Sequence, residues 1–327
     1  MLTMLKVSLT GFALLIGLVL PCTAQTQDKY PSRAVKIVVP FSPGGSIDVL
    51  ARTIGQKLSE RWAVPVVIDN KPGASGNIGT EFVAKSPADG YTLLMTASTI
   101  TITPSLMKNV GFDPIKSFAP VAQLAVGDLA LVARPGLEVR TVKGLIQLAK
   151  AHPGKLTYGS PGNGTPHHLA MEQLKLRAGF DALHVPYRGS GGLVTDVLSG
   201  QVDIAFIPIN QALAYIRAGK LQVLAAGGLK RTTATPDVPS LEEASGISDV
   251  DCNLWFGLYA PHGTAADAVA RVNTDVVAVL TSSQISGALS PLGLSPAPST
   301  PEELTRVTRT ELNRWRDVIR QANVRAD

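Results

Sequence analysis

The chain has 327 residues, of which 45% are hydrophobic and 17% charged, with 30 lysines and arginines against 25 aspartates and glutamates. The net charge of +5 is spread along the chain, and no run of basic residues interleaved with aromatic ones occurs, so a nucleic-acid partner is excluded. A mild positive charge favours an anionic small molecule instead.

The N-terminus has the pattern of a secretion signal over residues 1–24. Lys6 supplies a positive charge, an apolar run follows at 7–20, and small residues precede the expected cleavage site after Ala24. The apolar run of about 14 residues is shorter than the roughly 20 needed to span a bilayer, so we expect export. Lipid attachment at Cys22 is an alternative, disfavoured by the proline before it.

Cleavage of the signal would leave Cys252 as the single cysteine, so we expect no intramolecular disulfide. Stability must then come from hydrophobic cores, and about 300 residues are enough for two lobes.

In the first half of the chain, short β-branched runs alternate with longer helical patterns, which predicts an α/β fold with largely parallel sheets. Polar or glycine-rich loops follow three successive strands. Because ligands bind at the carboxyl ends of strands in such sheets, these loops form a candidate site. The expected strands are 35–40, 64–69 and 91–96, and the expected helices begin after residue 45 and at 78.

A similar alternation in the second half predicts a second lobe. We expect lobe 1 to comprise residues 25–128, lobe 2 to comprise 129–228, and the chain to return to lobe 1 over 229–327. The last helix has Thr300 as N-cap, followed by Pro301 and by Glu303, which completes a capping box. The other expected elements are helices at 141–151, 166–178, 192–198 and 210–218, and strands at 156–160, 202–207 and 221–226.

Two strand-to-helix loops have the same character, one in each half. Glycine lets the backbone approach a ligand, and the free N–H groups of a helix start favour a carboxylate or phosphate. Asp48 would orient the first loop or act only at the helix start. Two such loops indicate a ligand clamped between two lobes; they are Ser42-Pro43-Gly44-Gly45-Ser46 and Ser160-Pro161-Gly162-Asn163-Gly164-Thr165.

Three other kinds of site, for a nucleotide, a metal ion or hydrolysis, fit these loop residues poorly. A dinucleotide motif would need glycine where His167 stands, and no Gly-Lys-Ser/Thr of a P-loop follows either loop. A metal site at His168 and Glu172 lacks an evident third ligand. A hydrolase using Ser160 and His168 would have proline after the nucleophile, which removes an oxyanion-hole N–H.

A third loop follows His184. Tyr187 could stack on a ligand or hydrogen-bond to it, and Arg188 could pair with an anion or lie on the surface. Asp203, at the start of the next strand, is expected to fix neighbouring backbone.

Several motifs, in this order and spacing, give the chain a resemblance to the periplasmic substrate-binding proteins of the tripartite tricarboxylate transporter, the Bug family. They are Val39-Pro40-Phe41-Ser42-Pro43-Gly44-Gly45-Ser46-Ile47-Asp48, Pro72-Gly73-Ala74-Ser75-Gly76-Asn77-Ile78-Gly79, Asp89-Gly90-Tyr91, Val185-Pro186-Tyr187-Arg188-Gly189, Gly200-Gln201-Val202-Asp203, Pro236-Asp237-Val238-Pro239 and Trp255-Phe256-Gly257-Leu258-Tyr259-Ala260-Pro261.

The resemblance implies a periplasmic, monomeric, two-lobe Venus-flytrap of the type II periplasmic-binding class, with no cofactor and no catalysis. It implies a small carboxylate ligand (a di- or tricarboxylate, amino acid or aromatic acid) in the cleft and delivery to a membrane permease. A sensing role with a membrane receptor kinase stays open as an alternative. The implied ligand-binding residues are Phe41, Ser42, Gly44, Gly45, Ser46, Gly76, Asn77, Thr96, Ala97, Ser98, Ser160, Gly164, Thr165, His168, Tyr187, Gly189 and Ser190.

One segment departs from the family pattern. Where many members have an acidic or amide residue, this chain has Phe206-Ile207-Pro208-Ile209. The departure favours a ligand with an apolar or aromatic body.

Overall fold

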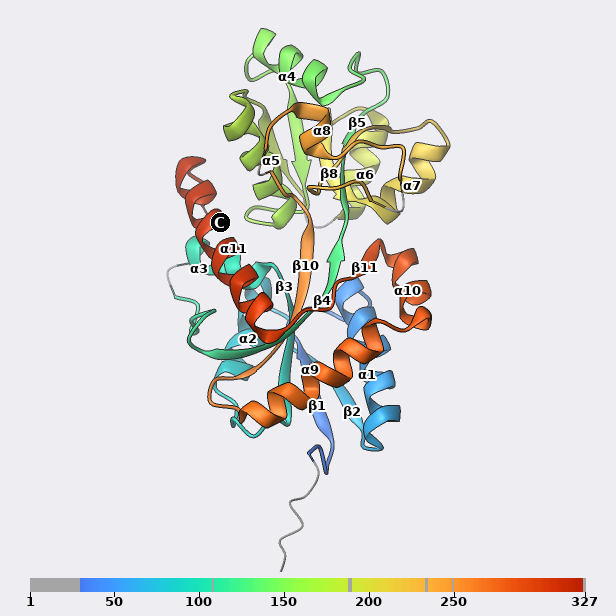
Figure 1. Cartoon of the computed structure of the whole chain (residues 1–327). Coiled ribbons are helices and arrows are strands. Elements are labelled where there is room, and N and C mark those ends of the chain that lie inside the picture. The colour runs from blue at the N-terminus through green and yellow to red at the C-terminus, as the bar shows by residue number, and fades with distance from the viewer. Residues whose placement is uncertain (1–29, 108, 188–189, 233–234, 249, 326–327) are drawn as a thin grey trace, which may run out of the picture.

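Two β-sheets, each with helices packed on both faces, make up the protein (Figure 1). The expected signal at 1–24, the cleavage site after Ala24 and the alternative at Cys22 lie outside the described residues. No helix within the described ranges is long and apolar enough to cross a membrane. The computed structural model describes residues 30–107, 109–187, 190–232, 235–248 and 250–325, with the backbone alone for 190 and 191.

The first sheet is mixed, with strand order β11-β4-β10-β3-β1-β2. Strands β1, β2 and β3 pair in parallel, as the sequence predicts. The pairings of β10 with β3 and β4, and of β11 with β4, are antiparallel, so the expectation of a largely parallel sheet is wrong here. The strand expected at 64–69 begins later, at Val66, because Pro65 has no N–H to donate. The strands are β1 (Val35–Val39), β2 (Val66–Asn70), β3 (Thr92–Ala97), β4 (Phe118–Gly127), β10 (Leu254–Pro261) and β11 (Leu294–Pro296).

Helices cover both faces of this sheet. The apolar stripe of α1 is buried against the sheet together with α9, which confirms the helical spacing predicted after residue 45. On the other face, Val83 of α2 and Leu304 of α11 share a core with Tyr259 of β10. The helices are α1 (Ser46–Trp62), α2 (Asn77–Ala84), α3 (Thr99–Leu106), α9 (Ala266–Leu280), α10 (Ser283–Leu289) and α11 (Pro301–Gln321), with short 3₁₀ turns η1 (Ala74–Gly76) and η2 (Ser290–Leu292).

The second sheet has the order β7-β6-β8-β5-β9 and two cores, one on each face. Strand β6 is parallel to both β7 and β8, whereas β5 runs antiparallel to β8 and β9. Its elements are β5 (Leu129–Ala133), α4 (Val142–Ala151), β6 (Thr157–Ser160), α5 (Pro166–Ala178), β7 (Leu183–Pro186), α6 (Ser190–Ser199), β8 (Ile204–Pro208), α7 (Ile209–Arg217), β9 (Gln222–Ala226) and α8 (Leu241–Ser245).

Two segments cross between the sheets and are tied to each other. Asp128 lies between β4 and β5, and Asn253 precedes β10. The amide of Asn253 donates to Asp128 Oδ1 at 3.1 Å, and its oxygen accepts the N–H of Leu129 at 3.1 Å. Because Leu241 and Cys252 are buried in a core of the second sheet, we propose that lobe 2 extends to about Cys252, beyond the expected end at 228.

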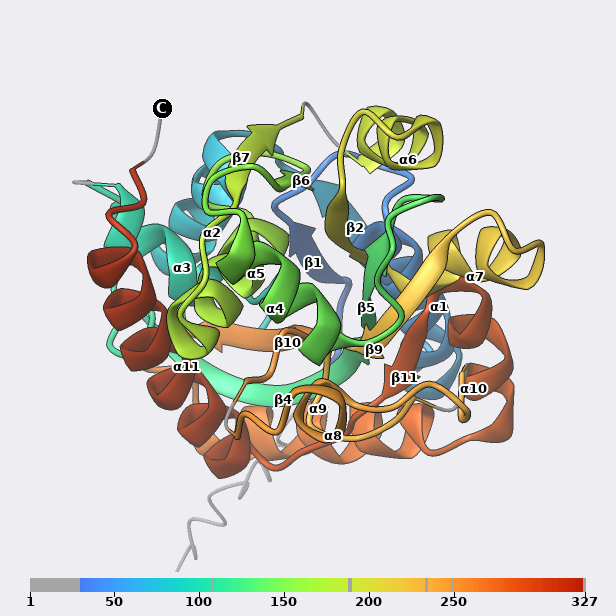
Figure 2. The same cartoon turned by 90° about the horizontal axis from the view of Figure 1, so that it is seen from above.

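Helix α11 forms a third link between the lobes, running past α3 and α5 (Figure 2). Thr300 and Glu303 form the predicted capping box. Further along, Trp315, Val318 and Ile319 bury their side chains with Ile102 of α3 and with Leu169 of α5, in the second lobe.

Gly79 shows how tightly α2 packs on the first sheet. A Cβ on Gly79 would lie 2.8 Å from both Lys71 O and Pro40 Cβ. We expect Gly79→Ala to lower the free energy of unfolding by about 1–3 kcal/mol, because backbone on two sides would have to move. Urea unfolding measures this change.

Gly287 in α10 is the matched control, since a Cβ there would meet no atom within 4 Å. Gly287→Ala should leave stability unchanged or raise it by up to about 1 kcal/mol through helix propensity. Equal unfolding midpoints for the two variants would contradict the packing argument.

Candidate functional site

A cavity of about 250 Å³ lies between the two lobes. The second-lobe loop touches α3 directly, because a Cβ on Gly164 would overlap Leu106 Cδ1. Of the expected ligand-binding residues that the structure describes, Gly164 and Thr165 line this cavity, whereas the first loop at 42–46 does not. The cavity is lined by Ser75, Thr99, Thr103, Leu106 and Met107 from the first lobe and by Asn163, Gly164 and Thr165 from the second.

The first loop, residues 42–46, presents unused hydrogen-bond donors. Gly44 has a φ of +87°, which glycine adopts without strain, and its N–H donates to Asp48 Oδ2 at 2.9 Å. Within the described part of the chain, no acceptor meets the N–H groups of Gly45 and Ser46 or the hydroxyls of Ser42 and Ser46. These exposed groups lie at the positive end of the α1 dipole, which favours an anion.

Asp48 braces this loop from behind, which is one of the two roles that the sequence left open. Its buried carboxylate accepts hydrogen bonds from Gly44 N–H, from Arg52 Nε at 3.0 Å and from Asn70 Nδ2 at 2.9 Å. The Asn70 amide also donates to Phe41 O at 3.1 Å. Burial acts to raise the pKa of Asp48, but the hydrogen bonds from Arg52, Gly44 and Asn70 outweigh it, so the pKa is lowered.

The loop after β2 is the most constrained backbone near the cleft. Residues 73–76 all have positive φ, including Ala74 at +47° and Ser75 at +56°, where a side chain is disfavoured. The Phe41 ring packs on Gly76, since a Cβ there would lie 3.2 Å from Phe41 Cζ. Asn77, at the start of α2, is buried and its amide contacts Met107 Sδ at 2.9 Å. Phe41, Gly76 and Asn77 thus belong to one packed unit beside the cavity.

Three further residues predicted for the site lie at the end of β3 and directly after it. Thr96 and Ser98 are buried and Ala97 is half-buried. Ser98 N–H donates to Trp255 O at 2.9 Å, and the carbonyl of Ser98 accepts the Thr101 hydroxyl at 2.7 Å. These contacts fix the start of α3, whose Thr99 and Thr103 line the cavity.

The second loop, residues 160–165, differs from the first because its donors are used internally. Gly162 N–H donates to Ser160 Oγ at 3.2 Å, and Gly164 N–H donates to His168 Nδ1 at 3.0 Å. The Thr165 hydroxyl and N–H both donate to Gly162 O. Thr165 also caps α5, accepting the N–H of His168. These hydrogen bonds hold the loop in one shape without a ligand.

Histidines support the second loop from both sides. His184, which sequence reasoning left out of the site, lies with its Nε2 2.7 Å from Ser160 Oγ. The only sequence signal for it was its place just before the third loop. Burial, His184 and Lys175, in that order, lower the pKa of His168 to about 3. The partner of Ser160 is therefore His184 and not His168, which corrects the pairing considered for a hydrolase.

Tyr187 is turned toward its own lobe. Its hydroxyl donates to Asp196 Oδ2 of α6 at 2.6 Å, and its N–H donates to Ser160 O. Burial and the Asp196 carboxylate raise the pKa of Tyr187 to about 12. Gly189 and the side chain of Ser190 lie outside what the structure describes.

Asp203 anchors backbone, as predicted. Its carboxylate accepts Thr157 N–H at 2.8 Å and pairs with Arg134 Nε at 2.7 Å. In the segment that departs from the family pattern, Phe206, Ile207 and Ile209 are fully buried in the cores of the second lobe. These three side chains therefore do not face the cleft.

Among the described residues, no three His, Cys, Asp or Glu side chains gather as a metal site requires. Glu172, considered with His168, instead accepts from the Tyr158 hydroxyl and pairs with Lys175 at 2.8 Å.

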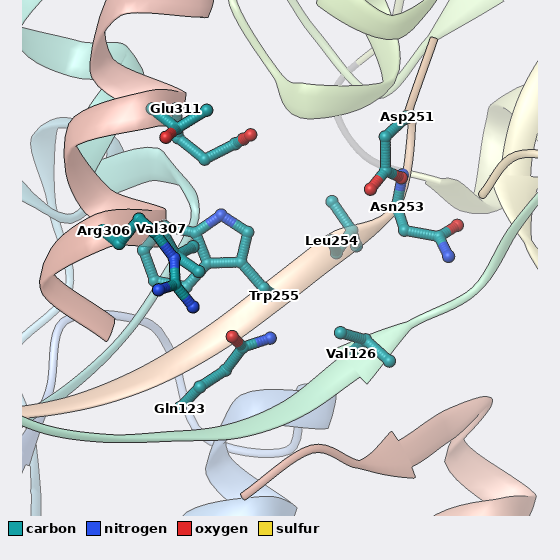
Figure 3. Close-up of a pocket in the computed structure, with 10 residues that line it drawn as sticks. Gln123, Val126, Asp251, Asn253, Leu254, Trp255, Arg306, Val307 and Glu311 are labelled. Atoms are coloured by element: carbon teal, nitrogen blue, oxygen red, sulfur yellow. The ribbon is translucent and has the colours of Figure 1, made fainter. Parts of the chain in front are cut away.

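A second pocket, of about 270 Å³, lies behind the crossing segments (Figure 3). Asp251 and Glu311 face it from opposite sides, and none of the predicted site residues lines it. Arg314 donates to Asp251 O at 2.8 Å and to Glu311 Oε2 at 2.7 Å, and burial raises the pKa of Glu311 against the opposing effect of Arg314. These groups tie α11 to the crossing segment.

The sequence matches relatives along almost its whole length. A protein of Pseudomonas sp. (strain P51) described as "UPF0065 protein in tcbD-tcbE intergenic region" is 35% identical, covering 93% of this chain and 90% of the relative. Protein BugT of Bordetella pertussis is 34% identical, covering 94% of each.

Solved structures agree with the fold. "R. palustris Rpa4515 with adipate" has a TM-score of 0.77 at 35% identity, covering 90% of this chain and 99% of that one. "MatC (Rpa3494) from Rhodopseudomonas palustris with bound malate" has a TM-score of 0.73 at 30% identity, covering 89% and 100%. The architecture is that of periplasmic binding proteins.

A family model described as "Tripartite tricarboxylate transporter family receptor" matches residues 50–324. Members of this family are periplasmic solute-binding proteins and not enzymes. The chain therefore belongs to the tripartite tricarboxylate transporter receptor family.

Proposed function

We propose that this protein captures a small carboxylate, with dicarboxylates as the favoured class, between its lobes. The observation that carries the proposal is the set of unused donors at the start of α1, on Ser42, Gly45 and Ser46. Two amides, two hydroxyls and the positive end of a helix dipole suit one carboxylate group.

The cleft supports a ligand with a short apolar body. Ser75, next to the Gly76 on which Phe41 packs, lines the same cavity as Leu106 and Met107. The lining thus combines the hydroxyls of Ser75, Thr99 and Thr103 with the apolar side chains of Leu106 and Met107. The two solved relatives were described with adipate and with malate, which are both dicarboxylates.

Capture would proceed by lobe closure over a ligand already held by the first loop. A ligand that contacts both lobes stabilises the closed state in proportion to its extra contacts there. The crossing segments at Asp128 and Asn253 are where the chain would bend. The second loop, already held in one shape, would meet the ligand as a preformed wall.

We keep the whole predicted set as the proposed ligand site and divide it by task. The first-lobe residues supply donors or shape the cleft floor: Phe41, Ser42, Gly44, Gly45, Ser46, Gly76, Asn77, Thr96, Ala97 and Ser98. The second-lobe residues form the closing wall: Ser160, Gly164, Thr165, His168, Tyr187, Gly189 and Ser190.

Delivery is the remaining part of the proposal. We propose that the signal at 1–24 is cleaved after Ala24, that the exported protein is a monomer, and that it passes its ligand to the permease of a tripartite tricarboxylate transporter. Family membership supports the permease as partner.

Gly45 tests the ligand site. A Cβ there would meet only Ser42 O, at 4.0 Å, so Gly45→Leu should fold while its side chain covers the α1 amides. We expect the affinity for adipate or malate to fall at least about tenfold in this variant, a loss of about 1.4 kcal/mol. Isothermal titration calorimetry measures it after a thermal-shift screen of the unmodified protein.

Gly287→Leu adds the same side chain on exposed α10 and should bind like the unmodified protein. Normal affinity in Gly45→Leu would refute the assignment of the first loop. No stabilisation of the unmodified protein by any carboxylate in the screen would refute the proposed ligand class.

Asp48 tests the loop brace through pH. Because its folded pKa is below the unfolded value of about 3.9, it stabilises the fold above pH 4 and loses this contribution as pH falls through the folded pKa. We expect Asp48→Asn to lower the unfolding free energy at pH 7 by about 1–3 kcal/mol and by less at pH 3. Urea unfolding at both pH values measures the difference.

Asp275→Asn is the matched control. Asp275 also has a lowered pKa, since hydrogen bonds from Trp62 and Arg61 outweigh its burial, but it lies between α1 and α9. Both variants should show a flattened pH dependence, whereas only Asp48→Asn should weaken ligand binding. Unchanged binding in Asp48→Asn would contradict the brace.

A further inference from the structure

The hydroxyl of Ser160 is entirely committed to its own lobe. Ser160 is fully buried, and its Oγ lies 3.0 Å from Gly162 O, 3.2 Å from Gly162 N and 2.7 Å from His184 Nε2. A hydroxyl has one proton and two lone pairs, so these three partners use its capacity. Ser160 therefore acts on a ligand through the shape of the loop.

Among the residues that the structure describes, His184 is the one partner of this hydroxyl that comes from outside the loop. Its ring lies 3.8 Å from the ring of His168, with 13° between their planes, and 4.8 Å from the ring of Tyr158, at 17°. Tyr158 and His168 are farther apart, at 6.1 Å. The stacked rings of Tyr158 and His168 thus hold the His184 ring in the orientation in which it contacts Ser160.

Both ends of the loop depend on these two histidines. His184 contacts Ser160 at the start, and His168 Nδ1 accepts Gly164 N–H near the end. That acceptor role requires His168 to be neutral, in agreement with its pKa of about 3. Behind them, the Tyr158 hydroxyl donates to Glu172, which pairs with Lys175.

We propose that His184 is a positioning residue for ligand capture, which holds the loop at 160–165 in its binding shape through Ser160 Oγ. This inference rests on the proposed function, because the loop is the wall that closes on the ligand. It assigns a role to a residue with no place in the predicted site, and it explains why a buried serine stands at the start of that wall.

The alternative role for His184 is packing alone, as a flat ring between Tyr158 and His168. Two substitutions separate the roles. His184→Phe keeps a ring for stacking and removes the nitrogen, whereas His184→Gln loses the ring and keeps a group that can hydrogen-bond to Ser160. If His184 positions the loop, His184→Phe should bind ligand more weakly than His184→Gln.

The first measurement needs no ligand. Amide hydrogen exchange of Gly162, followed by NMR in the free protein, should accelerate about tenfold in His184→Phe, the effect of one lost buried hydrogen bond, and change little in His184→Gln. Ser160→Ala should accelerate it at least as much, because it also removes the acceptor of the Gly162 N–H. The double variant should be no worse than Ser160→Ala alone, because that change already removes the contact with His184.

The second measurement is the affinity for adipate by calorimetry, which should follow the same order of variants. Additive effects of Ser160→Ala and His184→Phe, or a Gln variant impaired more than the Phe variant, would overturn the proposal. If His184→Phe does not fold, His184→Leu takes its place in the comparison. If the unmodified protein binds no carboxylate, the proposed function fails, while Gly162 exchange still decides the role of His184.

Discussion

The proposed ligand site depends on one buried carboxylate, Asp48, that supports a loop without using the loop's outward donors. An N–H group that points toward a ligand makes no hydrogen bond within its own loop, so another group must stabilise the turn. Asp48 does so by accepting Gly44 N–H, and Asn70 extends the brace to Phe41 O. The amides of Gly45 and Ser46 can then stay unpaired in a fixed geometry, as an anion site requires.

The two similar loops solve opposite problems. The first stays open because its brace lies behind it, whereas the second satisfies the Gly162 and Gly164 amides with Ser160 and His168. A loop that is already held in one shape loses little conformational entropy when it contacts a ligand. Donors without a partner gain the most binding free energy from a charged ligand. In the proposed function, specificity for a carboxylate would therefore reside mainly in the first lobe, and the second lobe would decide which ligand body fits when the lobes close.

Local sequence patterns were enough to predict most of the elements. The apolar spacing of α1 and the capping signals of α11 appear within short windows, and both were confirmed. The strand β10 and the extent of lobe 2 depend on contacts between distant segments, such as Cys252 with the core of the second sheet, which no window contains. In the site, the glycine-rich loops could be found from the sequence, but His184 could not. Its role follows from the pairing of β6 with β7, which places it opposite Tyr158 and brings its Nε2 to Ser160 Oγ.

Helix α11 limits how the lobes can move. Its residues Trp315 and Val318 pack with Leu169 of the second lobe, and Arg314 binds the carbonyl of Asp251 in the crossing segment. A rotation of one lobe relative to the other displaces atoms more the farther they lie from its axis. The contacts of α11 near the crossing segments would therefore be kept only if the axis passes close to them. If the lobes close as proposed, a rotation about such an axis would leave α11 in place and move the loops far from it most, which would direct the second lobe toward the first loop.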